Sequence, residues 1–283
     1  MLALKTDRYA FHAALMAALL ALAFILSAAV ARAGGAVAVF DHSSVRLLGG
    51  RMEKGIRLAG VEILLKDGWK TYWRVPGDAG QPPVFDWKGS ENVKSVTVLW
   101  PAPKRYADPE AGEAIGYKHR VIFPLRVAPA DAGKPVVLRL KLDYALCNEI
   151  CIPAHAQLER AIAPDAQGPD EELAAIDAFL ARVPVRGDDK LTVVRASVRS
   201  AHKRPELLVT LKGKGLDENT EIFVEGPALA SFCHPRFVSA QGDQATYFLP
   251  IDGIAGPQDM KGEELTLTII SAKRRVEQKV KLP

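Results

Sequence analysis

The chain has 283 residues, a net charge of +4 at neutral pH and three cysteines. Removal of a signal peptide at residues 1–33 would take away Lys5, Arg8 and Arg32 against Asp7 and leave a charge of +2. So small a charge argues against a nucleic-acid-binding surface, and three cysteines are too few to staple a small scaffold. The fold must therefore rest on hydrophobic cores, in one large or two ordinary domains.

The N-terminal segment has the pattern of a secretory signal peptide. Lys5 and Arg8 precede an apolar run at 13–30, and Ala31-Arg32-Ala33 is a small-x-small site followed by two glycines. We predict cleavage after Ala33 and export of the chain. An uncleaved anchor is the alternative, because the run approaches the roughly 20 residues that span a bilayer. After cleavage we expect no stable membrane insertion, since no second apolar run is long enough.

From residue 35 to 162, short segments with apolar residues at alternate positions are separated by Gly, Pro and Asp. This alternation predicts half-buried strands at 37–48, 55–66, 68–74, 84–87, 93–100, 117–127, 135–144 and 156–162. Residues 101–116 carry little periodicity and several prolines, so we expect a long loop there. Many short strands without helices between them predict an antiparallel β-sandwich of immunoglobulin type.

The pattern changes after residue 163. A linker at 164–168 precedes a predicted helix that opens with Asp170-Glu171-Glu172, keeps its apolar residues on one face and stops at Pro184. Strands then resume at 191–198, 206–212, 221–225, 236–240, 245–250, 265–271 and 275–282, which predicts a second, smaller sandwich. The fold class is all-β, two immunoglobulin-like domains joined by a linker helix. We set the signal peptide at 1–33, the first domain at 34–165, the linker helix within 166–189 and the second domain at 190–283.

Cys147 and Cys151 lie four positions apart at the end of an alternating apolar run, and Pro153 follows. Pro153 disfavours a helix, so the pair is expected to flank a tight turn at 148–150, where opposed side chains can form a disulfide. The ring so closed is short and stabilises the fold little. Two interpretations stay open: a structural disulfide, or a dithiol that exchanges with partner proteins.

Other residues near the pair suggest alternatives. Cys147, Cys151 and His155 together are a weak candidate for soft ligands of copper(I) or zinc. Asp143, Tyr144, Glu149 and His155 flank the cysteines and offer groups that tune a thiol or move a proton, although such residues near a turn are usually only solvated. We predict no cofactor and no metal site.

The third cysteine, Cys233, stands beside His234 in the second half. A lone cysteine in a β domain is most often a buried small hydrophobe, and the alternative is a resolving or intermolecular thiol. The tryptophans at 69, 73, 87 and 100 are expected to pack in the core rather than to bind sugar.

Whole motifs of the first half resemble the N-terminal periplasmic domain of the DsbD family of thiol:disulfide interchange proteins. They are the run 68–83 (GWKTYWRVPGDAGQPP), the strand 117–127 and the segment 143–154 (DYALCNEICIPA). The similarity is closest to the branch that includes the copper-tolerance protein ScsB, covers about residues 37–165, and extends more loosely to the second sandwich.

The resemblance implies an immunoglobulin-like fold whose redox pair, here Cys147 and Cys151, takes electrons from a membrane electron-transfer protein. The pair passes them to thioredoxin-like proteins in the periplasm, as a protein-disulfide reductase does. In the family a cap loop with an aromatic residue shields the pair; 101–116 is the expected counterpart, with Tyr106 and Tyr117 as candidate aromatics.

Two departures qualify this expectation. DsbD itself has a longer spacing between its cysteines, and this chain carries neither a multi-span membrane domain nor a C-terminal thioredoxin domain, so a separate reductant is expected. The alternative function is a non-enzymatic periplasmic binding or assembly module with a structural disulfide, linked to copper handling. The second domain is expected to serve for docking or spacing. The sequence leaves open the direction of electron flow, the attacking cysteine and the role of Cys233.

Overall fold

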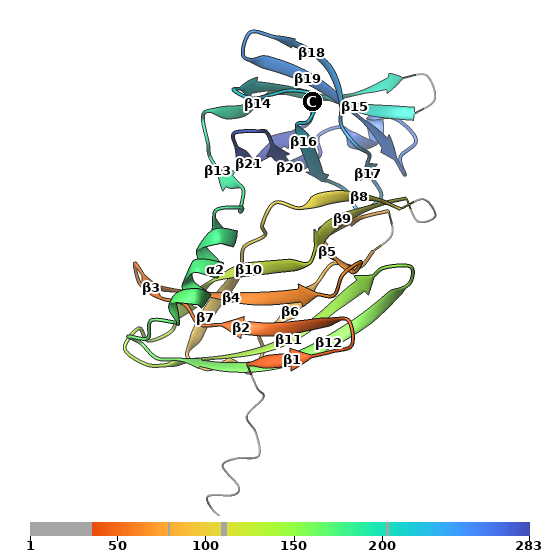
Figure 1. Cartoon of the computed structure of the whole chain (residues 1–283). Helices are drawn as coiled ribbons and strands as arrows, with labels where there is room; N and C mark the ends of the chain where they lie inside the picture. The colour runs from red at the N-terminus through yellow and green to blue at the C-terminus, as the bar shows by residue number, and fades with distance from the viewer. Residues whose placement is uncertain (1–35, 79, 109–111, 202–203) are drawn as a thin grey trace, which may run out of the picture. The chain divides into compact units, whose positions relative to one another are not determined.

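The computed structural model describes residues 36–78, 80–108, 112–201 and 204–283, and the predicted signal peptide lies outside them. The described residues form two β-sandwiches, the first from β1 to β12 and the second from β13 to β21 (Figure 1). Apart from β13 with β21, their paired strands run antiparallel. The predicted fold class is confirmed.

Two sheets make the first sandwich. One has the order β1-β2-β4-β10-β7, with β3 added to β4; the bounds are β1 Val37–Val39, β2 Ser43–Leu48, β3 Met52–Glu53, β4 Ile56–Leu65, β7 Val93–Val98 and β10 Arg120–Pro129. The other has the order β12-β11-β5-β9-β8, with β6 added to β11; the bounds are β5 Lys70–Gly77, β6 Val84–Asp86, β8 Lys104–Asp108, β9 Gly112–Lys118, β11 Val136–Cys147 and β12 Cys151–Ile162.

The core of this sandwich follows from the alternation along its strands. In β11, Leu138, Leu140 and Leu142 are buried, whereas Lys141 and Asp143 between and after them are exposed. Their apolar side chains meet those of β4 and β10 from the facing sheet in one cluster. Because the period of a strand is two, this burial fixes the register of β11 up to its end at Cys147.

Three expectations for the first sandwich are wrong. Residues 37–48 are a hairpin and not one strand, because β1 and β2 pair antiparallel with Val37 opposite Arg46. Residues 117–127 are not one strand: β9 ends at Lys118, His119 has a φ of 62°, and β10 begins at Arg120 in the other sheet. Residues 101–116 are not one long loop either, because β8 and β9 pair as a hairpin with Tyr106 opposite Ala114. Alternation of apolar residues does not reveal the positive φ at His119, and the β8–β9 hairpin is too short to show a clear period.

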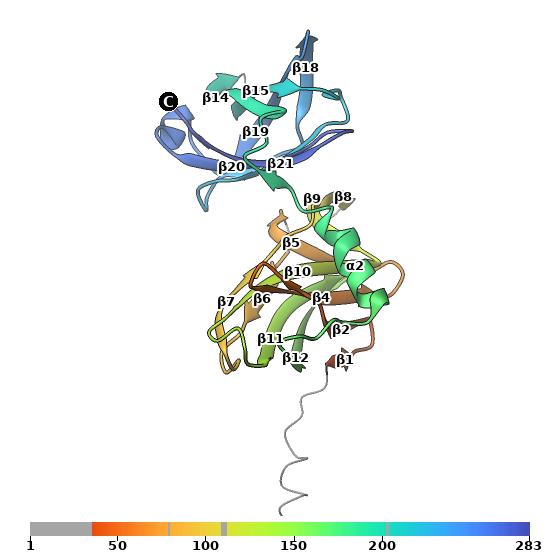
Figure 2. The same cartoon turned by 90° about the vertical axis from the view of Figure 1, so that its left-hand side faces the viewer.

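The linker helix α2, Asp170–Leu180, begins with three acidic residues, which suit the positive end of a helix. Ile176 is fully buried and belongs to the first core, and the helix packs against β10 (Figure 2). The Glu172 carboxylate accepts a hydrogen bond from the backbone N–H of Gly49 at 2.6 Å. The helix therefore belongs with the first sandwich. No helix of the described residues has the length and apolar character needed to cross a membrane.

The second sandwich also has two sheets. Their orders are β13-β21-β20-β16 and β14-β15-β19-β17, with β18 added to β19. The bounds are β13 Val185–Arg186, β14 Leu191–Ala201, β15 Arg204–Gly213, β16 Glu221–Glu225, β17 Ser231–Phe232, β18 Arg236–Gln241, β19 Gln244–Asp252, β20 Glu264–Ile270 and β21 Arg275–Lys281, with a short 3₁₀ helix, η1, at Pro257–Met260. Each of the seven strands predicted for this half has a counterpart, and their buried residues form a second core.

Candidate functional site

The β11–β12 hairpin brings the cysteine pair together. The two strands pair from Val136 with Ile162 to Cys147 with Cys151, and three residues close the turn, with the N–H of Asn148 donating to the carbonyl of Ile150 at 3.1 Å. The Cα atoms of the cysteines lie 4.2 Å apart and their sulfurs form a disulfide. The turn predicted at 148–150 is confirmed.

The two halves of this disulfide have different surroundings. Cys147 is 1% exposed and packs with Tyr72, Ala114 and Ala145, whereas Cys151 is exposed. The hydroxyl of Tyr72 lies 3.5 Å from Cys151 Sγ. A bridged sulfur has no proton, so the hydroxyl is the donor in this contact. An incoming thiolate can therefore reach Cys151 and not Cys147.

Tyr72 lies beside the pair and was not among the residues that the sequence singled out, although it stands within the run 68–83 that carries the family resemblance. It lies on β5, and its side chain is 1% exposed. Gly80 lies against its ring: a Cβ added there would stand 2.3 Å from Cε1 of Tyr72. The Gly80 position thus leaves the space that the tyrosine ring fills beside the disulfide.

The two candidate cap aromatics separate in the structure. Tyr106 of β8 packs against the cluster that contains Cys147, and the ammonium of Lys118 lies 4.8 Å from its ring centre. Burial raises the pKa of Tyr106. Tyr117 belongs to the main core instead, where its hydroxyl donates to the carbonyl of Pro101 at 2.7 Å and burial raises its pKa well above the ordinary range. Of the two candidates, Tyr106 is therefore the one that lies beside the pair.

His155 does not join the sulfurs. It lies opposite Asp143 in the hairpin, and its Nδ1 is 2.6 Å from Asp143 Oδ1 in an exposed pair. Within the described residues no group of three His, Cys, Asp or Glu side chains is placed to hold a metal ion. The copper or zinc interpretation of Cys147, Cys151 and His155 gains no support.

Of the other residues that flank the pair, Tyr144 points into the core. Its hydroxyl is 2.8 Å from Ser43 Oγ, and burial raises its pKa. Glu149 is exposed in the turn. Neither side chain forms a hydrogen bond with the sulfurs.

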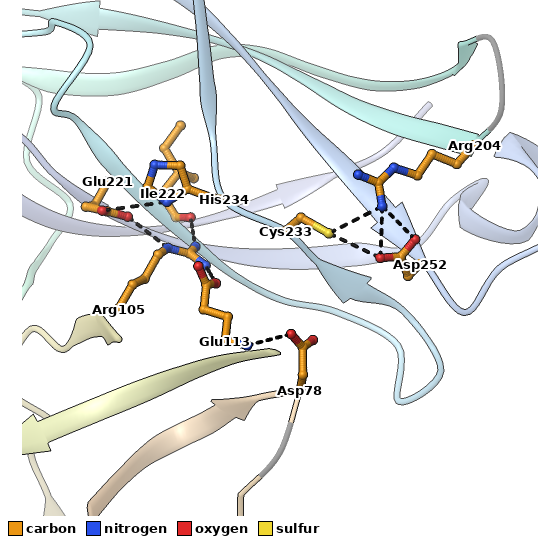
Figure 3. Close-up of polar contacts among 9 residues, drawn as sticks. All are labelled: Asp78, Arg105, Glu113, Arg204, Glu221, Ile222, Cys233, His234 and Asp252. Carbon is orange, nitrogen blue, oxygen red and sulfur yellow. Dashed lines mark hydrogen bonds and ion pairs between the residues drawn. The ribbon is translucent and has the colours of Figure 1, made fainter. Parts of the chain in front are cut away.

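Cys233 is a half-buried free thiol in the second sandwich. Its Sγ donates to Asp252 Oδ2 at 3.2 Å, and a guanidinium nitrogen of Arg204 lies 3.9 Å from it (Figure 3). Burial and the neighbouring Asp252 carboxylate raise the pKa of Cys233 to about 11. The thiol is thus protonated at neutral pH, which makes it a poor attacking group. His234 is turned toward Glu221, at 3.9 Å.

The tryptophans pack as expected. Trp73 is buried, and Trp69, Trp87 and Trp100 are partly buried against the first core. The ring of Trp100 meets that of Phe123 edge-on at 5.0 Å. They form no open aromatic face.

Two family models match the chain. Residues 52–163 match the model described as thiol:disulfide interchange protein DsbD, N-terminal, and residues 182–283 match a domain of unknown function, DUF8393. The first match contains Tyr72, Tyr106 and both cysteines of the hairpin. No curated protein sequence matches the chain.

A solved structure has the same fold. The N-terminal periplasmic domain of ScsB from Proteus mirabilis superimposes with a TM-score of 0.68 at 21% identity. The match covers 88% of this chain and 98% of that one, so it includes both sandwiches. At this identity the match establishes the fold.

Proposed function

Because residues 52–163 form a domain of the DsbD N-terminal type, we propose that the chain is a periplasmic thiol–disulfide exchange protein. Its Cys147–Cys151 pair would relay electrons between a membrane reductase and thioredoxin-like proteins. The observation that carries the proposal is the unequal burial of the pair, with Cys147 enclosed and Cys151 exposed. Only one of two bonded sulfurs is then open to attack, as an ordered exchange requires.

The exchange has two steps in each direction. A thiolate of the reducing partner attacks Cys151 Sγ, the bond between the two sulfurs breaks, and Cys147 leaves as a thiolate that takes up a proton. The partner's second thiolate then attacks the partner sulfur that is bonded to Cys151, so the partner becomes oxidised. Cys151 leaves as a thiolate and takes up a second proton. Two electrons and two protons have entered the chain.

Delivery reverses these steps. The Cys151 thiolate attacks the disulfide of an oxidised thioredoxin-like partner, and Cys147 resolves the mixed disulfide, so that the bridge forms again and the partner is reduced. The Tyr72 hydroxyl, 3.5 Å from Cys151 Sγ, is placed to donate to the thiolate in both directions. Tyr106, beside the cluster of Cys147, limits access from that side.

The proposal also includes the cellular location of the chain, its domain limits and the role of its second domain. We assign the periplasm from the predicted signal peptide at 1–33 and from the similar ScsB domain, which is described as periplasmic. We propose domain limits of 34–165 and 190–283 with the linker helix between them, and a docking or spacing role for the second domain.

The test uses single cysteine variants of the mature chain with a thioredoxin-like protein. Cys147→Ser should trap a mixed disulfide through Cys151, Cys151→Ser should trap none, and both should lose turnover. Cys233→Ser is the matched control and should exchange at the wild-type rate. Unchanged exchange in both hairpin variants would exclude the proposal and leave the binding or assembly module with a structural disulfide.

A further inference from the structure

The sheet that carries the disulfide has a second face, which points away from Cys147. Along β5 and the β8–β9 hairpin, neighbouring residues point to opposite sides of the sheet. Tyr72, Ala114 and Tyr106 lie on the side of Cys147. Their neighbours Trp73, Ile115 and Arg105 lie on the other side, where Phe223 of β16 joins the first core.

Arg105 connects the hairpin to the second sandwich on that other side. Its side chain is 6% exposed, and its guanidinium donates to Glu221 Oε2 at 2.9 Å and to the carbonyl of Ile222 at 2.8 Å. It also pairs with the carboxylate of Glu113, on the other strand of the same hairpin. Figure 3 shows Arg105 between Glu113 and the β16 residues. One buried cation thus joins both strands of the hairpin to the second sandwich.

Other contacts also hold the β8–β9 hairpin in this position. The ring of Phe223 lies 4.5 Å from the Arg105 guanidinium and meets Trp73 edge-on at 5.6 Å. Near the turn of the hairpin, Asp78 exchanges two hydrogen bonds with Glu113, from the Glu113 N–H to Asp78 Oδ2 at 2.8 Å and from the Asp78 N–H to the Glu113 carbonyl at 2.9 Å. The hairpin is therefore held at two points: Glu113 bonds to Asp78, and Arg105 bonds to the second sandwich.

We propose that Arg105 is a positioning residue through which the second sandwich braces the β8–β9 hairpin, so that Tyr106 stays beside Cys147 and keeps this second sulfur of the disulfide closed to thiols. Arg105 and Tyr106 are consecutive residues of β8, so a displacement of the β8 backbone that separates Arg105 from Glu221 also moves Tyr106 away from the cluster of Cys147. The second domain then controls access to the Cys147 sulfur of the redox pair. The value of this control rests on the proposed function, whereas the brace itself does not.

The experiment measures the rate constant for reduction of the disulfide by dithiothreitol in the full mature chain, carrying Cys233→Ser throughout. Arg105→Gln and Glu221→Gln should each raise the rate about tenfold, the effect of about 1.4 kcal/mol on the opening of the hairpin. Arg105→Lys should restore part of the restriction, because one ammonium cannot reach all three acceptors. Arg199→Gln, which removes a separate Arg–Glu pair within the second sandwich, is the control and should react like the wild type.

Two companion measurements distinguish bracing from a general loss of structure. Hydrogen exchange should accelerate at 105–107 and 113–115 in the Arg105 and Glu221 variants and stay unchanged in the second core. Tyr106→Ala should react at least as fast as Arg105→Gln. Wild-type reduction rates in both Arg105→Gln and Glu221→Gln would overturn the proposal, as would a wild-type rate in Tyr106→Ala.

Glu221→Gln decides the matter if Arg105→Gln does not fold. Failure of the wild-type chain to exchange with a thioredoxin-like protein would contradict the proposed function alone, because the dithiothreitol rates would still test the brace.

Discussion

Cys147 and Cys151 are four positions apart, yet one sulfur is enclosed and the other is open. The difference comes from the position of each on its strand: Cys147 ends β11 against the side chains of β5 and β9, and Cys151 begins β12 at the edge of the sheet. A thiolate that forms at Cys151 meets water on one side and the Tyr72 hydroxyl on the other. Reactivity at this site is therefore decided by single side chains.

Removing the Tyr72 hydroxyl tests this view of Cys151. In reduced Tyr72→Phe the Cys151 thiolate loses a charge-assisted hydrogen bond worth about 1.5 kcal/mol, so alkylation of Cys151 by iodoacetamide at pH 7 should fall about tenfold. Mass spectrometry of each cysteine peptide measures it. Tyr144→Phe is the control: it removes a buried hydroxyl that is 2.8 Å from Ser43 Oγ and should leave alkylation unchanged. Equal rates in the two variants would rule out a role for Tyr72.

At Cys233 the surroundings favour the neutral thiol and not the thiolate, which predicts how its reactivity depends on pH. Burial and Asp252 raise its pKa from 9.0 to about 11, so the neutral thiol is favoured in the folded chain. The associated stability is complete below pH 9 and is lost as the pH rises toward 11. Alkylation of native Cys233 should thus rise with a midpoint near pH 11, and Asp252→Asn should lower that midpoint. A midpoint near 9 in the native wild-type chain would contradict the assignment.

At the scale of elements, the β8–β9 hairpin is held by close backbone contact as well as by side chains. β9 passes so near β5 that a Cβ added at Gly116 would lie 2.0 Å from the carbonyl oxygen of Thr71. A backbone atom cannot turn aside as a side chain can. The glycine therefore permits the approach of the hairpin to the strand that bears Tyr72.

Gly116→Ala should disturb this contact. We expect the free energy of unfolding to fall by about 1–3 kcal/mol, the range for overpacking in a tight site. Gly133→Ala is the control, since its nearest neighbour is the Asp131 side chain at 3.4 Å, and it should change stability by less than about 0.5 kcal/mol. Urea denaturation measures both. Equal midpoints for the two variants would show that β9 has room to move.

The sequence pattern predicted the features of this fold that depend on neighbouring residues in the chain. Alternating apolar residues located most strands, and Pro153 with the short 148–150 interval identified the cysteine turn. The pattern did not predict Tyr72 beside Cys151, because their contact spans 79 positions and depends on the pairing of β5 within the sheet. It merged β9 with β10, since strands of different sheets can share one apolar alternation.

At the scale of the whole molecule, the second sandwich packs directly on the first. Phe223 of β16 is counted among the buried residues of the first core, and Arg74 of β5 pairs with Glu225 and Glu277 of the second sandwich. These contacts join residues more than a hundred positions apart, so no sequence window contains them. They pack the second domain against the strand β5, whose other side bears Tyr72 beside the redox pair.

In the proposed function, the Cys147–Cys151 bridge is broken and re-formed by exchange and is not a permanent structural disulfide. Its reduction potential in the mature Cys233→Ser chain tests this most directly, by equilibration with glutathione buffers and mass spectrometry of trapped thiols. We expect a value within the range of exchanging thiol proteins, about −120 to −270 mV. A potential below about −300 mV, where structural disulfides lie, would contradict it.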